Sequence, residues 1–489
     1  MHAEPLHPQP LRPHTATAPS VAPTQVGAAA AVGAVREQAI PQVRIDYQAA
    51  GTLKRHVSEQ LLAEGKRNPS LVGAVREQRA RALINEAVSV WADSAGQGVR
   101  PVSAAQERAM AAVVFDMLFR AGRLQRYLDD DRVENILING HDQCFLDFGD
   151  ERLVRVEPVA DSEEELRELV RDLARTSGQG ERTFSTGHPL LALRLADGSR
   201  LEAMCEVTGE RTYVTIRRHR IKDADLDEMA ALGTVTPAVK QFLSACVRAE
   251  RNVMIVGEQN SGKTSLLRAL LKEIPPGERF GTLETEFELW AHRNGFHQQV
   301  VPMEARESNG ERVDGRAAGE ITLLDLMRRA LRMSLTRIVV GEVRGPEITA
   351  LMQALTNGRG GNLCTMHASA PHVVFDRIAE LYLLAQGNFS SELAYRQIAN
   401  GLHLIVFLSI DHTGPRKRRY VSHVWEITGV GEGGRPAYNE IFGPDAEWAP
   451  AQAVPRTPPS PGMLKRLEAA GFDAQVLHLP GAWRPGVHV

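Results

Sequence analysis

The chain has 489 residues, which is too long for a single hydrophobic core, so two to four domains are expected. Hydrophobic residues make up 43% of the chain, enough to bury sizeable cores. The formal net charge of −3 gives no electrostatic footprint for nucleic acid, and we therefore expect no direct nucleic-acid partner.

The four cysteines lie far apart and lack the spacing of metal ligands. This pattern is typical of buried free thiols in a reducing compartment. The N-terminus has no apolar signal-peptide core, and no run approaches the ~18 apolar residues of a membrane span. The sequence therefore predicts a cytoplasmic protein, whatever partner it docks on.

The first predicted regions lie before the middle of the chain. Residues 1–42 are rich in Pro and Ala, and we expect a disordered tail. Residues 43–130 carry apolar positions three to four apart, which predicts a helical subdomain of about three helices. Residues 131–222 combine short strands with an amphipathic helix that begins at a capping box, so they predict an α+β domain.

The second half of the chain predicts a different architecture. Residues 223–236 are polar and are interpreted as a linker. In residues 237–442 strands alternate with helices, which indicates an α/β domain with a mainly parallel sheet. Residues 443–489 turn Pro-rich and are interpreted as a C-terminal tail with one short helix.

A phosphate-binding loop is the strongest motif in the chain. It reads G-E-Q-N-S-G-K-T, fits the pattern G-x-x-x-x-G-K-[ST] (Walker A), and lies between an apolar strand and a helix. Lys263 is expected to reach the β- and γ-phosphates of ATP, and Thr264 to bind Mg²⁺. The predicted nucleotide-binding residues are Gly257, Glu258, Gln259, Asn260, Ser261, Gly262, Lys263, Thr264 and Ser265.

Hydrolysis also needs acidic groups near the metal ion. Residues 337–342 form an apolar strand that ends in Glu342, which is predicted to lie beside Mg²⁺ at the carboxyl edge of the sheet, as in a Walker B motif. Residues 281–288 are interpreted as a strand that ends in three carboxylates, of which Glu284 or Glu288 is the candidate base for water. His367 ends a further strand and is predicted to contact the γ-phosphate or these acids.

The order of these motifs resembles that of the type II/type IV secretion ATPase superfamily, and within it the branch that assembles Flp/Tad pili. The resemblance covers roughly residues 43–442. It includes the phosphate loop, the segment T-L-L-D-L-M-R-R-A-L-R-M at 322–333, R-I-V-V-G-E-V-R at 337–344 and G-N-L-C-T-M-H-A at 361–368.

This resemblance implies a RecA-like P-loop NTPase motor domain joined by the linker to an N-terminal α+β domain. It further implies a homo-hexameric ring that binds ATP between the two domains and drives an inner-membrane platform protein, so that the ATPase is peripheral to the membrane. N-domain arginines approach the phosphates in that family, which makes Arg194 and Arg217 candidates. Thr285 departs from the family pattern, because the acidic motif usually has a carboxylate there.

Two other functions remain open on the sequence. An ATP-binding regulatory sensor with little turnover is compatible with the altered position Thr285. A RecA-like motor on nucleic acid would also carry these motifs, although the near-neutral charge argues against it.

Overall fold

The computed structural model describes residues 45–95, 102–149, 153–177, 183–218, 225–306, 312–313, 316–317, 319–385, 389–413, 417–444 and 453–478. The tail predicted at residues 1–42 lies outside these ranges. The four cysteines are buried and unpaired, as expected. Within the described ranges, no helix is both long enough and apolar enough to cross a membrane.

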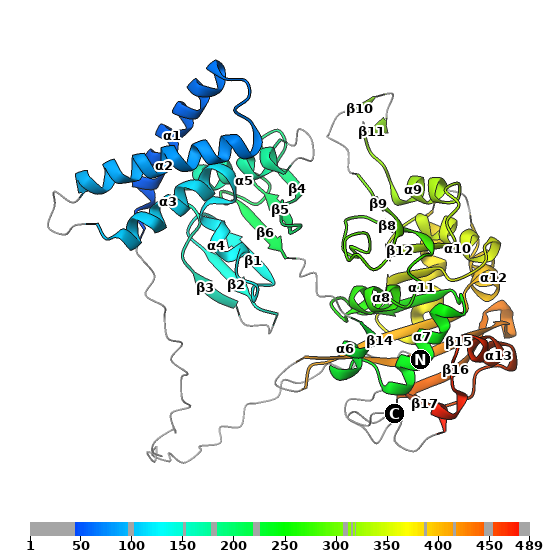
Figure 1. The fold of residues 1–489 in the computed structure, drawn as a ribbon. Helices are drawn as coiled ribbons and strands as arrows, with labels where there is room; N and C mark the ends of the chain where they lie inside the picture. The colour runs from blue at the N-terminus through cyan, green and yellow to red at the C-terminus, as the bar shows by residue number, and fades with distance from the viewer. Residues whose placement is uncertain are drawn as a thin grey trace, which may run out of the picture.

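The N-terminal region is a layer of helices (Figure 1). Asp46 caps the first helix, and a capping box of Ser103 and Gln106 begins the third. Their apolar stripes, which include Val57, Ile84 and Val114, form one small core. The helices are α1 (Tyr47–Arg67), α2 (Gly73–Ala95), α3 (Ala104–Phe119), η1 (Gly122–Leu124) and α4 (Gln125–Leu128).

An antiparallel six-stranded sheet follows, in the order β3-β2-β1-β6-β5-β4. Strands such as β1 and β6 alternate buried and more exposed residues, because α5 (Glu163–Thr176) packs its apolar stripe on one face of the sheet. The edge strand β3 does not alternate. Ser162 caps α5, as the capping box predicts. The strands are β1 (Asn135–Asn139), β2 (Cys144–Asp147), β3 (Leu153–Val156), β4 (Leu190–Arg194), β5 (Arg200–Met204) and β6 (Tyr213–Arg217).

A nine-stranded mixed sheet forms the second domain, in the order β17-β16-β15-β14-β7-β13-β12-β8-β9. From β14 to β9 neighbouring strands are parallel, and from β14 to β17 they are antiparallel. This is the predicted α/β motor domain. The strands are β7 (Val253–Gly257), β8 (Arg279–Glu284), β9 (Gln299–Glu304), β12 (Arg337–Val343), β13 (Leu363–His367), β14 (Leu404–Asp411), β15 (Arg418–Val430), β16 (Pro436–Pro444) and β17 (Ala453–Pro455).

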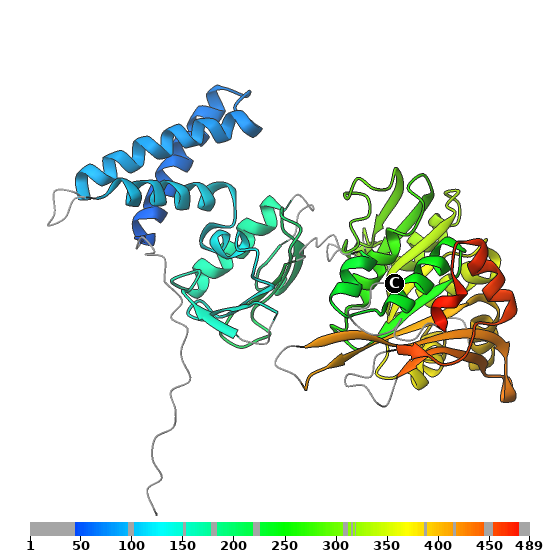
Figure 2. The ribbon, with the colours of Figure 1, turned by 60° about the horizontal axis from the view of Figure 1, so that its bottom comes forward.

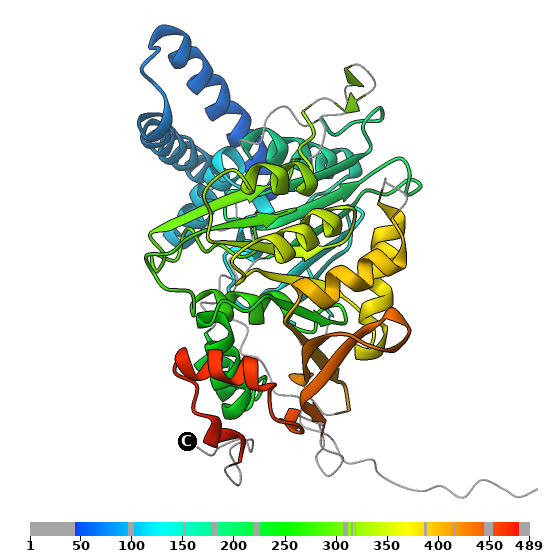
Figure 3. The same cartoon turned by 90° about the vertical axis from the view of Figure 1, so that its right-hand side faces the viewer.

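Helices cover both faces of this sheet, so successive residues of β7 belong to different cores. One core lies under α6 (Leu226–Ala231), α7 (Pro237–Arg248), α8 (Lys263–Leu271) and α13 (Pro461–Ala469). The other lies under α9 (Leu323–Ala330), α10 (Glu347–Asn357), α11 (Val374–Leu384) and α12 (Ser391–Gly401). Figure 3 shows this second layer, coloured yellow-green to gold, facing the viewer. A two-stranded ribbon, β10 (Arg312–Val313) and β11 (Arg316–Ala317), extends from the domain (Figure 1).

Two segments are more structured than the sequence analysis expects. The interpreted linker 223–236 contains α6, whose Leu226 and Met229 are buried in the motor core. The interpreted tail 443–489 contributes β17, α13 and η4 (Ala474–Leu477), and Met463 and Leu467 are buried against the motor. Figure 2 shows this C-terminal segment in red, packed on the motor domain. A few well-spaced apolar residues are enough to dock a polar, Pro-rich segment on an existing core.

Candidate active site

The phosphate loop leaves the centre of the motor sheet between β7 and α8. Gly257 and Gly262 have φ angles of 156° and 94°, which favour glycine. A Cβ on Gly257 would also lie 2.4 Å from the carbonyl oxygen of Leu408 on β14, so a side chain cannot fit there. Asn260 adopts a left-handed conformation at the top of the loop.

Lys263 lies within this loop and is buried. Its Nζ donates to the carbonyl oxygens of Gly257 at 3.1 Å and Glu258 at 2.7 Å. Burial lowers the pKa of Lys263 to about 8. Ser261 is buried too, and its Oγ has no hydrogen-bond partner among the described residues. A buried cation, a buried hydroxyl and glycine-lined backbone at a helix N-terminus fit the phosphates of ATP.

His367 lies between the phosphate loop and the carboxylate of Glu342 on β12. Its Nδ1 lies 3.1 Å from Nζ of Lys263, and its Nε2 lies 2.9 Å from Oε1 of Glu342. Arg344 pairs with the other oxygen of Glu342. Burial, then the charge of Lys263, lowers the pKa of His367 below its ordinary value, which favours the neutral ring. Oε1 of Glu342 is buried and has no hydrogen-bond partner among the described residues, so its contact with Nε2 is a close approach of the two groups.

This line of residues exists because β13 lies between β7 and β12 in a parallel sheet. His367 is in register with Gly257, and all three strands end at the same edge. The sequence analysis predicted that His367 contacts the phosphates or the acids, and the structure places it against Glu342.

Thr264, near the start of α8, is a candidate ligand for a metal ion. Its Oγ1 donates to Oε2 of Glu288 at 3.4 Å. Mg²⁺ is usually held by one or two carboxylates together with substrate phosphates and waters. The hydroxyl of Thr264 and the carboxylates of Glu288 and Glu342 are oxygen donors that suit it.

Glu284 has a different environment from Glu288. The strand predicted for residues 281–288 ends at Glu284, because its Oε2 accepts from the backbone N–H groups of Glu288 and Leu289, both at 2.7 Å, and turns the chain. Glu284 is buried, which raises its pKa to about 7. Glu286 and Glu288 therefore lie on a loop after the strand, and Glu288 contacts Thr264.

The two candidate arginines are not part of the line from Lys263 to Glu342. Arg194 ends β4 and pairs with Glu304, the last residue of β9. Arg217 ends β6 on the side away from α5. Burial is the main cause that lowers the pKa of Arg268 on α8, and the charge of Arg217 is a smaller one.

Sequence reasoning missed three residues next to the site. Glu304 binds Arg194 and the backbone N–H of Phe287 in residues 285–293, the acidic loop after β8. Arg344 pairs with Glu342, and Arg419 Nε donates to the carbonyl oxygen of Asn260 at 2.8 Å. Arg419 belongs to a basic run that the sequence places at a hairpin turn. Its position across β14 from the phosphate loop depends on strand order, which no local pattern encodes.

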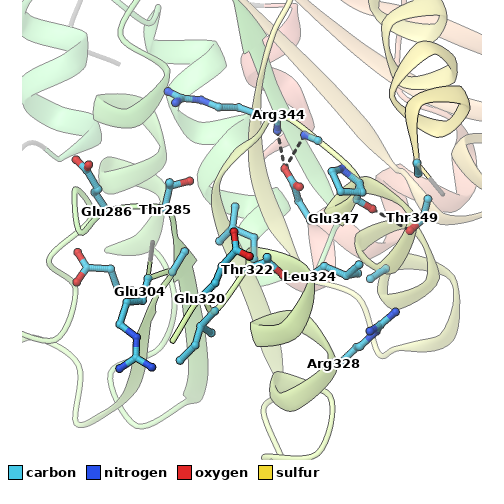
Figure 4. Close-up of a pocket in the computed structure, with 18 of the residues that line it drawn as sticks. Thr285, Glu286, Glu304, Glu320, Thr322, Leu324, Arg328, Arg344, Glu347 and Thr349 are labelled. Atoms are coloured by element: carbon cyan, nitrogen blue, oxygen red, sulfur yellow. Dashed lines mark hydrogen bonds between the residues drawn. The ribbon is translucent and has the colours of Figure 1, made fainter. Parts of the chain in front are cut away.

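A separate pocket of about 1170 Å³ lies between β4 of the N-terminal domain and α9 and α10 of the motor. Figure 4 shows Thr285, Glu286 and Glu304 along one side of it and Arg328 and Thr349 on the other. None of its lining residues belongs to the phosphate loop. It shares the acidic loop and Arg344 with the site and is not the nucleotide site itself.

Comparison with known proteins gives a consistent assignment. The family model described as type II/IV secretion system protein matches residues 189–410. A Mycobacterium tuberculosis protein named for conjugal transfer is 32% identical over 304 residues, which cover 61% of this chain and 82% of the relative. The type IV secretion system protein VirB11 of Brucella suis is 28% identical over 336 residues, 63% of this chain and 89% of that protein.

Among solved structures, the VirB11 ATPase of the Brucella suis type IV secretion system in complex with sulphate is similar over 65% of this chain and 94% of that one. The sequence identity is 25% and the TM-score is 0.33.

Proposed function

Since the chain belongs to the type II/IV secretion ATPase superfamily, we propose that it is a Mg²⁺-dependent ATPase whose hydrolysis powers pilus assembly or protein secretion. The observation that carries this proposal is the line Lys263, His367 and Glu342 at one edge of the parallel sheet, directly behind the phosphate loop. In this line the imidazole of His367 lies between a phosphate-binding cation and a metal-side carboxylate.

Each residue has a defined task in this proposal. Lys263 leaves its carbonyl partners and binds the β- and γ-phosphates. Glu342 and Thr264 hold the metal side of the site, and Glu288, rather than the buried Glu284, orients the attacking water. His367, which lies between Lys263 and Glu342, couples the presence or loss of the γ-phosphate to Glu342. Bound Mg²⁺ would neutralise charge that develops on the phosphate oxygens.

The assembly is part of the same proposal. Six copies form a ring, each holding ATP between its N-terminal and motor domains, and Arg217 approaches the phosphates, as the family resemblance implies. The ring acts on an inner-membrane platform protein at the cytoplasmic face of the membrane. The motif order at residues 322–344 and 361–368 supports the Flp/Tad branch.

The first experiment is phosphate release per subunit with Mg²⁺ and ATP over a wide range of protein concentration. We expect the specific rate to rise with concentration, because neighbouring subunits complete the site, and to fall about 100-fold or more in Lys263→Ala. Lys465→Ala, an exposed lysine on α13, is the matched control and should keep the wild-type rate. Tight ATP binding without turnover at any concentration would instead support a regulatory sensor.

A further inference from the structure

The segment that carries Glu288 is held by residues of both domains. We call residues 285–293, between the end of β8 and the approach to β9, the acidic loop. From the motor side, Glu284 binds the backbone N–H groups of Glu288 and Leu289. Glu284 and Glu304 are register partners on β8 and β9, and Ala305 N donates to Glu284 O at 2.8 Å, so the loop begins beside the end of β9.

From the other side, the β4–β5 turn of the N-terminal domain contacts the same loop. Arg194, before the turn, pairs with Glu304, and Arg200, after it, lies 3.0 Å from Oε2 of Glu286. Between them, Gly198 has a φ of +90°, and a Cβ on it would lie 3.4 Å from Cζ2 of the buried Trp290. The turn therefore contacts the loop at Glu286 and Trp290, and the adjoining end of β9 at Glu304.

One carboxylate oxygen links the two domains to the backbone of the loop. Oε1 of Glu304 accepts from Arg194 and from the backbone N–H of Phe287, the latter at 2.8 Å. The guanidinium carbon of Arg194 also lies 5.2 Å from the ring centre of Phe287. Phe287 precedes Glu288, whose carboxylate contacts Thr264. Glu304 and Phe287 therefore form a continuous chain of contacts from Arg194 to Glu288, the acid proposed to orient the attacking water.

We propose that Arg194 is a positioning residue that acts through Glu304. It holds the acidic loop so that Glu288 faces Thr264 while the β4–β5 turn is seated, and a movement of the N-terminal domain unseats the loop and stops hydrolysis. This inference rests on the proposed function, and it differs from the role implied by the family, in which this arginine approaches the phosphates.

The Arg194–Glu304 pair is expected to affect the rate of hydrolysis more than the stability of the fold. Arg194 and Glu304 are each about a quarter exposed, at 28% and 23% of the side chain, so the pair contributes little to global stability. Catalysis is far more sensitive, because a displacement of about 1 Å in a reacting group lowers the rate by about 100-fold. Domain movements that break a weak pair can therefore change turnover greatly.

The first arm of the test uses nucleotide-free protein. Hydrogen exchange is measured on peptides that span residues 285–290 in the wild type, Arg194→Gln and Arg211→Gln. Arg211 is the matched control, because it pairs with Asp142 inside the N-terminal domain. We expect Arg194→Gln to accelerate exchange at Phe287 and Glu288 by at least about tenfold, since about 1.4 kcal/mol of local protection corresponds to that factor, and Arg211→Gln to leave it unchanged. Unchanged exchange in Arg194→Gln would overturn the inference.

The second arm is a double-mutant cycle on Mg²⁺-ATP turnover. Arg194→Gln and Glu304→Gln should each lower kcat about 10- to 100-fold with KM unchanged, and the double variant should be no slower than Arg194→Gln alone. Arg194→Lys should recover part of kcat by keeping the charge. Multiplicative losses, or a rise in KM for Arg194→Gln alone, would assign Arg194 to the phosphates and refute the positioning role. If the wild type shows no turnover, the proposed function fails, while the exchange arm still decides whether Arg194 holds the loop.

Discussion

The two acidic parts of the site are positioned by different means. Glu342 is the penultimate residue of the central strand β12, and His367 ends the neighbouring strand β13. The two strands pair on both sides of a register irregularity at Glu342, so their backbones position the two side chains. Glu288 lies on a loop held by side chains of two domains. The sheet edge can therefore stay constant while the loop responds to domain movement, which separates nucleotide binding from the control of hydrolysis.

The largest expected effect comes from the sheet edge. Glu342→Gln should lower kcat about 100-fold or more, since it removes a metal-side charge, and His367→Ala should follow it closely because it cuts the link to Lys263. ATP binding should persist in both variants. Steady-state phosphate release and nucleotide titration measure these effects, with Glu380→Gln, an exposed acid on α11, as control. A fully active Glu342→Gln variant would contradict the role given to the sheet edge.

The next prediction compares the two acids of the loop region. Glu288→Gln should lower kcat about 10- to 100-fold, as loss of a group that orients water does. Glu284→Gln should change kcat less, because a glutamine oxygen can still accept from the two backbone N–H groups that define the turn. Single-turnover rates with Mg²⁺ and ATP distinguish the two. The reverse order would assign the water to Glu284.

A smaller effect is expected where β15 touches the phosphate loop. Arg419→Ala removes the hydrogen bond that holds Asn260 in its left-handed conformation. We expect KM for ATP to rise roughly threefold to tenfold, or about 0.7 to 1.4 kcal/mol, with kcat unchanged. Arg418→Ala, an exposed neighbour, is the control. Equal KM values for both variants would show that this contact does not shape the loop.

The last prediction concerns stability and its dependence on pH, and leaves turnover aside. Burial raises the pKa of Glu284 from 4.5 to about 7, so its contribution to stability is full below pH 4.5 and is lost as the pH rises through 7. Glu284→Gln should therefore raise the free energy of unfolding at pH 8 by at most about 3 kcal/mol relative to the wild type, and Tm should rise with it. Both differences should vanish near pH 4.5.

Thermal unfolding of both proteins across this pH range checks the prediction. Glu278→Gln is the opposite control. Burial alone would raise the pKa of Glu278, but hydrogen bonds from Arg337 and Thr336 and the charge of Arg337 together outweigh it and hold this pKa below its ordinary value. The control variant should therefore lose stability at pH 8. A pH-independent Tm difference for Glu284→Gln would mean that the carboxyl is not titrating in this range.

The same contrast explains what could be predicted from the sequence. The phosphate loop needs glycines, a strand and a helix within a few residues, and Glu342 and His367 each end an apolar strand, so local patterns located them. The partner of Arg194 could not be found in this way, because Glu304 is brought to it by the packing of two domains. The end of β8 at Glu284 depends on a side chain folding back on its own backbone, which a hydrophobic pattern does not record.

The C-terminal segment has a practical consequence for anyone who shortens this protein. Phe472, beyond α13, meets the ring of Phe242 on α7 edge to face with centroids 5.7 Å apart, and Phe242 also contacts Phe442 on β16. Cutting the chain after residue 444 would expose this aromatic cluster to solvent and leave an apolar, aggregation-prone surface on the motor domain. A truncation before residue 478 is therefore expected to aggregate.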